Sequence, residues 1–477
     1  MLEWMENGVP KCWLNISNVS NWFNRSRGVR HAVPLGYDSY VLMNLRDKQI
    51  LYLSLPSIVS NITVPLLGLV DVAITGHLGS AAYIGAIAVG GMLFNIIYWM
   101  FAFLRMGTSG ITSQAFGARN LTEVVSVLLR ALFVACVIST AMLCVQVPLR
   151  ELALAVIMPS EEVAAYTRIY FNICIWSAPA ALSLFVLTGW CVGMQNTWIP
   201  MAVAIIQNVA NITVSLVLVY VCGMRIEGVA MGTVLAQYVG LAVTLWLMAR
   251  NYLRLKKFFE RKMVLTKASL QKFFMLNKDI FLRTCCLILV HFFFIAAGAK
   301  QGDVELAVNT LLMQLFTLYS YIMDGFAFAG EAMVGKAIGG RMRGIYDETV
   351  SRLFRWGWGV AALFTVAYLL GGKPFLAMLT DDAAVVAALQ VYQPWTLLFP
   401  LCGMAAFIWD GIYIGATATK GMLISMASGM AVFFMLYVVL VPLWGNHGLW
   451  VAFVVYLTTR GVVQTLMRKK IWPNRTK

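Results

Sequence analysis

The chain has 477 residues, of which 60% are hydrophobic and 12% are charged, and its mean hydropathy is +0.78. A soluble protein of this length could not remove that much apolar surface from water, so the composition excludes a soluble protein. The formal net charge of +15 does not indicate nucleic-acid binding, because the basic residues gather in alternate loops between apolar runs.

Residues 1–43 are polar and contain no apolar segment of the kind found in a signal peptide. We expect a disordered cytoplasmic extension, or a start codon placed too early, since Met43 directly precedes the first apolar run. The membrane-spanning part of the chain is therefore predicted to begin at residue 44.

Twelve apolar runs follow, and each is long enough to cross a bilayer as a helix, which takes about 20 residues. Lipid offers no hydrogen-bond partners, so these lengths and compositions predict an all-α integral membrane protein. The spans are placed near 50–78, 84–115, 123–149, 163–191, 195–222, 226–250, 268–298, 303–338, 346–372, 384–416, 418–444 and 446–467.

The spans divide into two sets of six. We predict an N-terminal lobe at 44–252, a basic cytoplasmic linker at 253–267, a C-terminal lobe at 268–470 and a basic tail at 471–477. Basic side chains collect before the first span, in the linker and at the C-terminus, so the positive-inside rule places both termini in the cytoplasm.

The two sets of spans repeat each other at a fixed separation of 222 positions. The matched pairs include Gly76 and Gly298, Gly117 and Gly339, Arg119 and Arg341, Gly189 and Gly411, and Gly223 and Gly445. Both halves start on the same side, so the repeats are parallel and related by an axis along the membrane normal. Such a duplication is typical of secondary transporters, whose lobes rock around a site between them.

Four acidic side chains within predicted spans stand out, because an ionisable group at mid-membrane costs roughly 2.5–3.5 kcal/mol and therefore needs a reason. Asp71 is the lone acid of span one and lies towards the outer half of the membrane. We interpret it as a group that carries a proton, binds Na⁺ or neutralises a cationic substrate. The alternative is a hydrogen bond that fixes one helix to another.

Asp410 lies in span ten between Trp409 and Tyr413, whose aromatic faces favour cations. Its match in the first half is Thr188, so the fold of the repeat does not require a charge there. We predict ion coupling at Asp410 and cavity lining by the two aromatic residues, with a structural polar contact as the alternative.

Asp324 and Glu331 are seven residues apart in span eight, so they share one helix face. We predict that they line the cavity, with an internal salt-bridge network as the alternative. Arg105 is taken as the main basic residue within a span, with a structural role near the inner end. There it would hold backbone carbonyls or a helix of the other lobe, rather than Asp71.

Asn208 and Asn211 share one face of span five, and Thr233 lies on span six. Polar side chains in membranes often join helices, which is one interpretation of these three. The other, which we predict, is that they line a polar cavity shared with Asp71.

Four segments carry a family resemblance: VPLLGLVDVAITGHLG at 64–79, FLRMGTSGITSQAFG at 103–117, DGFAFAGEAMVG at 324–335 and DGIYIGAT at 410–417. They resemble the multidrug and toxic compound extrusion (MATE) family, in its DinF-like branch, over roughly residues 44–470. The resemblance implies a V-shaped, two-lobe transporter that exports organic cations in exchange for protons or Na⁺.

The resemblance also assigns roles to individual residues. Asp71 falls on the family's first-helix Asp, Asn211 on its fifth-helix Asn, Thr233 on its sixth-helix Thr, and Asp410 on the tenth-helix acid associated with cation coupling. Two departures stand out, because Val72 replaces the usual Thr after the first-helix Asp and Ser215 replaces a frequent Asp. The first lobe is therefore one acid poorer than in many members.

Together these observations predict a secondary antiporter that exports organic cations, several drugs among them, across the cytoplasmic (inner) membrane. It would exchange them for protons or Na⁺ by alternating access. We expect a monomer in the lipid bilayer with no enzyme activity, no cofactor and no nucleic-acid partner, and with no metal site beyond Na⁺ at Asp71 or Asp410. The alternative is a flippase or exporter of a lipid-linked or amphiphilic metabolite, which the small number of basic residues within the spans disfavours.

Overall fold

The computed structural model describes residues 38–76, 81–377 and 382–472, and every regular element in these ranges is helical. The first lobe contains α3 (Asp38–Gly76), α4 (Ala81–Phe101), α5 (Phe103–Gly117), α6 (Leu121–Cys144), α7 (Gln146–Ile157), α8 (Glu161–Cys174), α9 (Ala178–Gly193), α10 (Trp198–Leu216) and α11 (Ile226–Tyr252). The second lobe contains α13 (Lys267–Ala299), α14 (Asp303–Gly339), α15 (Arg343–Ala377), α16 (Ala383–Tyr392), α17 (Pro394–Gly415), α18 (Thr419–Trp444) and α19 (Asn446–Met467). A 3₁₀ turn at Leu253–Phe258 and the short α12 (Arg261–Val264) join the lobes.

Eleven helical segments of the described chain are long and apolar enough to cross a membrane, and they correspond to predicted spans two to twelve. The first span lies in α3, a continuous helix of 39 residues. Helices α4 and α5 together form the second span, and α8 and α9 form the fourth. The prediction of an all-α membrane protein with two six-span halves is confirmed.

Two further predicted spans are each divided into two helices, and the helix of the first span begins at Asp38 rather than near residue 50. Span three was expected to reach residue 149, but α6 ends at Cys144 and a separate helix, α7, follows. Span ten divides into α16 and α17 at Gln393. In each case a proline, Pro148 or Pro394, lies in the first turn of the new helix, where its missing N–H costs nothing.

The predicted N-terminal extension lies almost wholly outside the described residues. Only its last part, from Asp38 onwards, belongs to α3. Residues 473–477 of the predicted C-terminal tail also lie outside the described residues.

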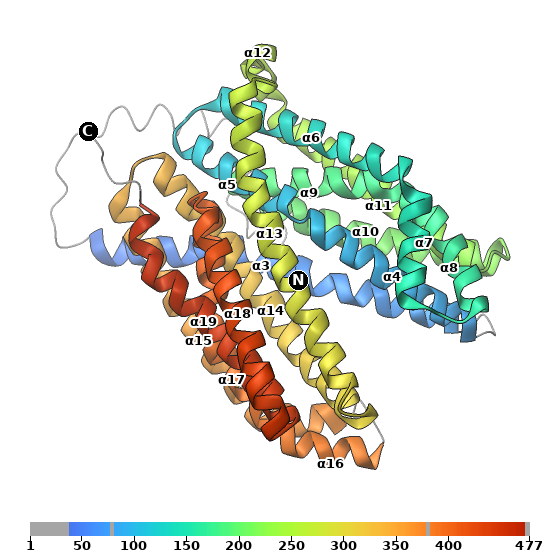
Figure 1. Ribbon diagram of the computed structural model, residues 1–477. Helices are drawn as coiled ribbons and strands as arrows, with labels where there is room; N and C mark the ends of the chain where they lie inside the picture. The colour runs from blue at the N-terminus through green and yellow to red at the C-terminus, as the bar shows by residue number, and fades with distance from the viewer. Residues whose placement is uncertain (1–37, 77–80, 378–381, 473–477) are drawn as a thin grey trace.

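The two lobes are separate helix bundles that meet at an angle (Figure 1). They come together near α5, α6 and the basic linker, and they diverge towards α8 and α16. We call the end at which they meet the linker side, because the linker from Leu253 to Val264 lies there. A layer of buried apolar residues that includes Leu104 of the first lobe and Tyr319 of the second joins them.

The repeat is also present in the backbone conformation. Six residues with positive φ form three pairs that are each 222 positions apart. They are Arg119 and Arg341 (60° and 55°), Gln195 and Thr417 (64° and 54°), and Gly223 and Gly445 (68° and 54°). Since non-glycine residues rarely adopt this conformation, its recurrence at matched positions indicates that both halves end these helices in the same way.

Helix crossings repeat in the same register. A Cβ atom at Gly189 of α9 would lie 2.2 Å from the carbonyl oxygen of Arg105 in α5. A Cβ atom at Gly411 of α17 would lie 2.2 Å from the carbonyl oxygen of Ala327 in α14. Both crossings therefore require glycine, which lets the helix backbones approach closely, as is common in membranes.

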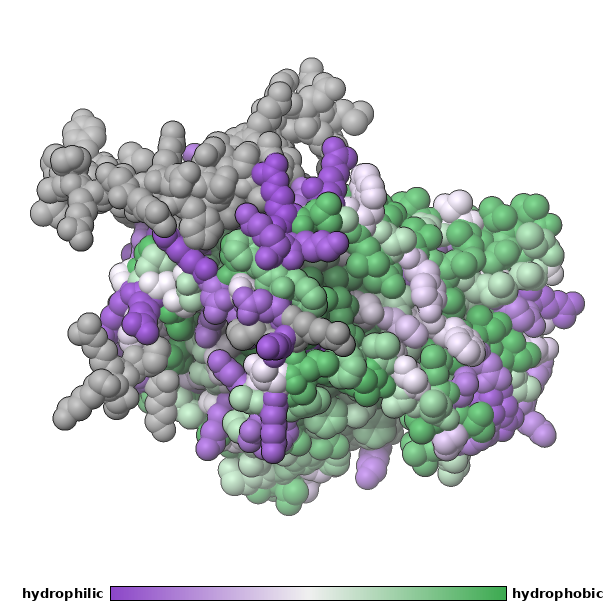
Figure 2. Space-filling view, turned by 90° about the horizontal axis from the view of Figure 1, so that it is seen from above, coloured by the Kyte–Doolittle hydropathy of each residue, from purple (hydrophilic) through white to green (hydrophobic). Residues whose placement is uncertain are grey.

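The outer surface is suited to lipid. Large apolar side chains are exposed around both bundles, among them Leu370, Leu443 and Leu466. Figure 2 shows apolar residues over much of one face, with polar residues gathered in separate patches. This distribution fits a protein whose lateral surface contacts hydrocarbon rather than water.

Candidate functional site

Asp71 lies in α3, five residues before the helix ends at Gly76 on the side opposite the linker. Its side chain is 7% exposed. Within the described chain, its Oδ1 atom has no hydrogen-bond partner, and no salt bridge to Asp71 is formed. A buried carboxyl without a basic partner is stable only when it holds a proton or a cation.

A polar cluster joins α10 to α11 nearby. The amide nitrogen of Asn211 donates to the hydroxyl of Thr233 at 3.1 Å, and the hydroxyl of Ser215 donates to the side-chain oxygen of Asn211 at 3.5 Å. Tyr170 of α8 is buried near both this cluster and Asp71.

Asn208 takes a different position. Its amide nitrogen donates to the backbone carbonyl of Thr63 in α3 at 3.0 Å. It therefore connects α10 to the helix that carries Asp71. Its predicted role in lining a cavity stays a prediction, as do those of Asn211 and Thr233.

Asp410 lies in α17, five residues before the helix ends at Gly415 on the linker side. Both of its carboxylate oxygens are occupied. Arg283 of α13 and Arg460 of α19 form salt bridges with Oδ2, the latter at 2.8 Å, and the amide nitrogen of Gln464 donates to Oδ1 at 2.6 Å. The site is thus a buried cluster of two positive charges and one negative charge.

Trp409 and Tyr413 of α17 bond to α19, the helix that also carries Arg460 and Gln464. The indole nitrogen of Trp409 donates to the hydroxyl of Thr465 at 2.8 Å, and the hydroxyl of Tyr413 donates to the carbonyl of Gln464 at 2.7 Å. Both side chains are buried, so their polar groups fix α17 to α19. Cavity lining by these aromatics stays a prediction.

Glu331 of α14 lies where the two lobes meet. Arg105 of α5 forms a salt bridge with it at 3.3 Å, and the hydroxyl of Ser109 donates to its Oε2 at 2.6 Å. The Arg105 guanidinium also stacks on the ring of Phe328, 4.0 Å from its centre. Ser109 and Glu331 are 222 residues apart, so they are equivalent positions of the repeat in direct contact.

Arg105 thus contacts a helix of the other lobe, and its structural role stays a prediction. It also corresponds to the salt-bridge alternative that was considered for Glu331. Asp324, two turns away on α14, is only partly buried, and no described residue forms a salt bridge with it. The charges of Arg105 and Arg283 nevertheless act on Asp324.

Further hydrogen bonds tie the lobes together near the linker side. The side-chain amide of Gln114 donates to the carbonyl of Gly415 at 2.9 Å and to the hydroxyl of Thr417 at 3.1 Å. The side-chain amide of Gln195 donates to the carbonyl of Ala332 at 2.6 Å. These bonds, together with those of Glu331, hold the two lobes in contact on the linker side.

Sequence reasoning missed Arg283 and Arg460. Each is the only arginine of its predicted span, and that was itself the signal, because a membrane-buried base needs a partner. Their proximity to Asp410 could not be read from the sequence, since the three residues lie on three different helices.

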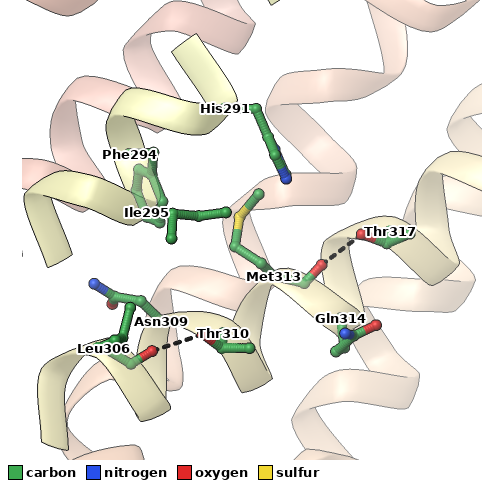
Figure 3. Close-up of a pocket in the computed structure, with 9 residues that line it drawn as sticks. All are labelled: His291, Phe294, Ile295, Leu306, Asn309, Thr310, Met313, Gln314 and Thr317. Carbon is green, nitrogen blue, oxygen red and sulfur yellow. Dashed lines mark hydrogen bonds between the residues drawn. The ribbon is translucent and has the colours of Figure 1, made fainter. Parts of the chain in front are cut away.

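A small cavity of about 120 Å³ opens between α13 and α14 (Figure 3). His291 points towards it from α13, and its ring also contacts Trp99 of α4 at a centroid distance of 6.3 Å. The hydroxyls of Thr310 and Thr317 bond to carbonyls of their own helix. The cavity is smaller than the roughly 300 Å³ that a drug-sized ligand needs.

The sequence profile of the MatE family matches the chain twice, at residues 56–217 and 280–440, once in each lobe. The chain is 37% identical over 432 residues to DNA damage-inducible protein F of Escherichia coli (strain K12), covering 90% of this chain and 94% of that protein. It is 24% identical to the "Probable multidrug resistance protein NorM" of Xanthomonas axonopodis pv. citri, covering 87% of this chain and 92% of that protein.

Solved structures agree with the fold. The Vibrio cholerae MATE transporter VcmN in its bent form has a TM-score of 0.81 at 18% identity, covering 90% of this chain and 98% of that one. A MOP superfamily transporter from Pyrococcus furiosus, described by the reverse polarity of its binding pocket, has a TM-score of 0.76 at 18% identity, covering 89% and 96%. The chain therefore belongs to the MATE family of membrane transporters, in its DinF-like branch.

Proposed function

We propose that this protein is a secondary antiporter that exports organic cations across the cytoplasmic membrane in exchange for protons. The observation that carries the proposal is Asp71, a buried carboxyl with an unpartnered oxygen and no basic neighbour in the described chain. Such a group can hold either a proton or a cationic substrate, but not both at once.

Competition at Asp71 supplies the coupling. A proton that binds there from outside removes the negative charge that holds the cationic substrate, and the substrate leaves. The exchange drives transport only if the two ligands prefer different arrangements of the lobes, since a ligand shifts a conformational equilibrium by its difference in affinity for the two states. The cluster of Asn211, Thr233 and Tyr170 lies where it can respond to the charge of Asp71.

The arrangement of the lobes suits the state that releases substrate. Contacts of Glu331, Gln114 and Gln195 hold the lobes together on the linker side, and the bundles diverge on the other. The basic linker favours a cytoplasmic position for the linker side. The lobes would then open to the outside, with Asp71 near the open end.

A second candidate is the export of an amphiphilic or lipid-linked metabolite. The observation that favours it is the presence of Arg283 and Arg460 in the membrane, besides Arg105. These residues weaken the sequence argument that bases within the spans are few. Acids neutralise them in part, however, so we rank this function second.

The test is efflux of a fluorescent organic cation from proteoliposomes that contain the full-length protein. A pH gradient and a Na⁺ gradient are imposed separately on the wild type, on Asp71→Asn and on the exposed control Asp303→Asn. We expect efflux driven by the pH gradient in the wild type and the control, and none in Asp71→Asn. A wild-type rate in Asp71→Asn rules the mechanism out, and no efflux from folded wild type under either gradient favours the metabolite exporter.

A further inference from the structure

Asp410 is the residue at which the family resemblance implies a coupling cation in the second lobe. Na⁺ binds through several oxygen ligands, as other hard cations do, and it needs a carboxylate that is free to face it. A Na⁺ site at Asp410 would therefore require at least one carboxylate oxygen that no basic side chain occupies.

The negative charge of Asp410 is already neutralised by neighbouring side chains of the protein. Oδ2 accepts from two guanidinium groups, those of Arg283 and Arg460, and Oδ1 accepts from the amide of Gln464. A metal cation that approached either oxygen would meet two fixed positive charges at close range, in an interior where such repulsion is poorly screened.

The buried polar atoms near Asp410 that lack a hydrogen-bond partner also disfavour a metal cation. The Nε atoms of Arg283 and Arg460 are buried donors with no hydrogen-bond partner in the described chain, and the Oε1 atom of Gln464 is a buried acceptor with none. Donors therefore outnumber acceptors among the unsatisfied groups. This balance suits a water molecule or an anionic group, and it opposes a metal cation.

The two arginines reach Asp410 from different directions. Arg460 lies on α19, which also fixes Trp409 and Tyr413 of α17. Arg283 comes from α13, and its charge acts on Asp324 as well as on Asp410. Arg283 therefore lies among the acidic groups of the second lobe, with its salt bridge directed to Asp410.

We propose that Arg283 occupies Asp410 as a fixed positive charge and excludes Na⁺ from this carboxylate, so that Arg283 determines the ion specificity of Asp410. This inference concerns the ion specificity of the proposed antiporter. Only its consequence for transport rests on the proposed function. Na⁺ binding to the purified protein tests it without any transport reaction, so the two proposals can fail separately.

The measurement is binding of radioactive Na⁺ to the full-length protein in detergent, at constant ionic strength kept with choline. The quantity of interest is the part of the binding that Asp410→Asn removes. We expect none in the wild type, and none in the control Lys300→Gln, which removes an exposed charge next to the end of α13. We expect Arg283→Gln to gain saturable Na⁺ binding of this kind.

The double variant Arg283→Gln with Asp410→Asn should return to the wild-type level. Saturable Na⁺ binding to the wild type that Asp410→Asn abolishes overturns the proposal. So does a folded Arg283→Gln that binds no more Na⁺ than the wild type. If Arg283→Gln does not fold, the comparison of the wild type with Asp410→Asn still decides the matter, and Arg283→Lys should remain without binding.

Discussion

Asp71 and Asp410 are both buried acids on membrane helices, each five residues from the end of its helix, yet their surroundings are opposite. Asp71 has no basic neighbour within the described chain, whereas Asp410 holds two arginines and a glutamine. Duplication gave the lobes the same backbone, and the positions that match Asp410 and Arg283 in the first lobe are the uncharged Thr188 and Asn61. The two lobes therefore share a fold, but their matched positions differ in chemistry, and of these two acids only Asp71 lacks a basic partner in the described chain.

The largest effect is expected from Asp71→Asn. Asparagine has nearly the same shape as aspartate, but its amide is uncharged and cannot take up and release a proton. Gradient-driven efflux should therefore fall to the level of empty vesicles. Stability in detergent should change by less than about 1 kcal/mol, because no ion pair is lost. Asp410→Asn, compared under the same gradients, should lose activity only as far as it loses folded protein.

Asp410→Asn should instead affect stability. Removing one partner of a buried ion pair leaves the other charge uncompensated, at a cost of about 3–5 kcal/mol. Thermal unfolding of the purified protein should show a clearly lower midpoint than that of the wild type or of Asp71→Asn. Equal midpoints for the two variants would contradict the contrast between the lobes.

Glu331→Gln should loosen the closed side. The glutamine keeps a hydrogen bond to Ser109 but loses the salt bridge with Arg105, and charge-assisted bonds contribute about 1.5–3 kcal/mol. Hydrogen–deuterium exchange should rise in α5 and in the linker-side half of α14, and remain unchanged in α18. No change in α5 would mean that Glu331 does not hold the lobes together.

Gly189→Ala and Gly411→Ala test whether the backbones are as alike as the repeat suggests. Each would place a methyl group 2.2 Å from a carbonyl oxygen of a crossing helix, and the overpacking should cost about 1–3 kcal/mol in both lobes. Gly359→Ala in α15 is the control, since nothing lies within 4 Å of the added atom. Unfolding midpoints that differ widely between the two lobes would break the symmetry of the scaffold.

The smallest effect is expected outside the membrane. Arg168 and Arg150 hold the pKa of Glu151 in α7 below its ordinary value of 4.5. A lowered pKa stabilises the fold above the ordinary value, and this contribution disappears as the pH falls through the pKa of the folded state. Glu151→Gln should therefore lower the unfolding midpoint slightly near neutral pH and not at all in acid, because exposed ion pairs contribute little.

Sequence patterns predicted most of the fold because hydropathy, loop charge and the repeat are local or periodic signals. They placed the spans, and they singled out Asp71 as the lone acid of its helix. They could not reveal that Asp410 is neutralised, because its partners Arg283 and Arg460 come from helices separated from it by long stretches of sequence. The breaks before α7 and α17 were missed because a proline in an apolar run is compatible with either a bent helix or two helices.

The contact between Ser109 and Glu331 bears on how the protein arose. In a symmetric pair of identical six-helix chains, these two positions would be one residue facing its own copy. A glutamate there would meet a second glutamate at hydrogen-bonding distance, and the two could coexist only by sharing a proton. The present pair, at 2.6 Å, needs no such proton, because the two halves of this chain differ at these matched positions and a hydroxyl faces the carboxylate.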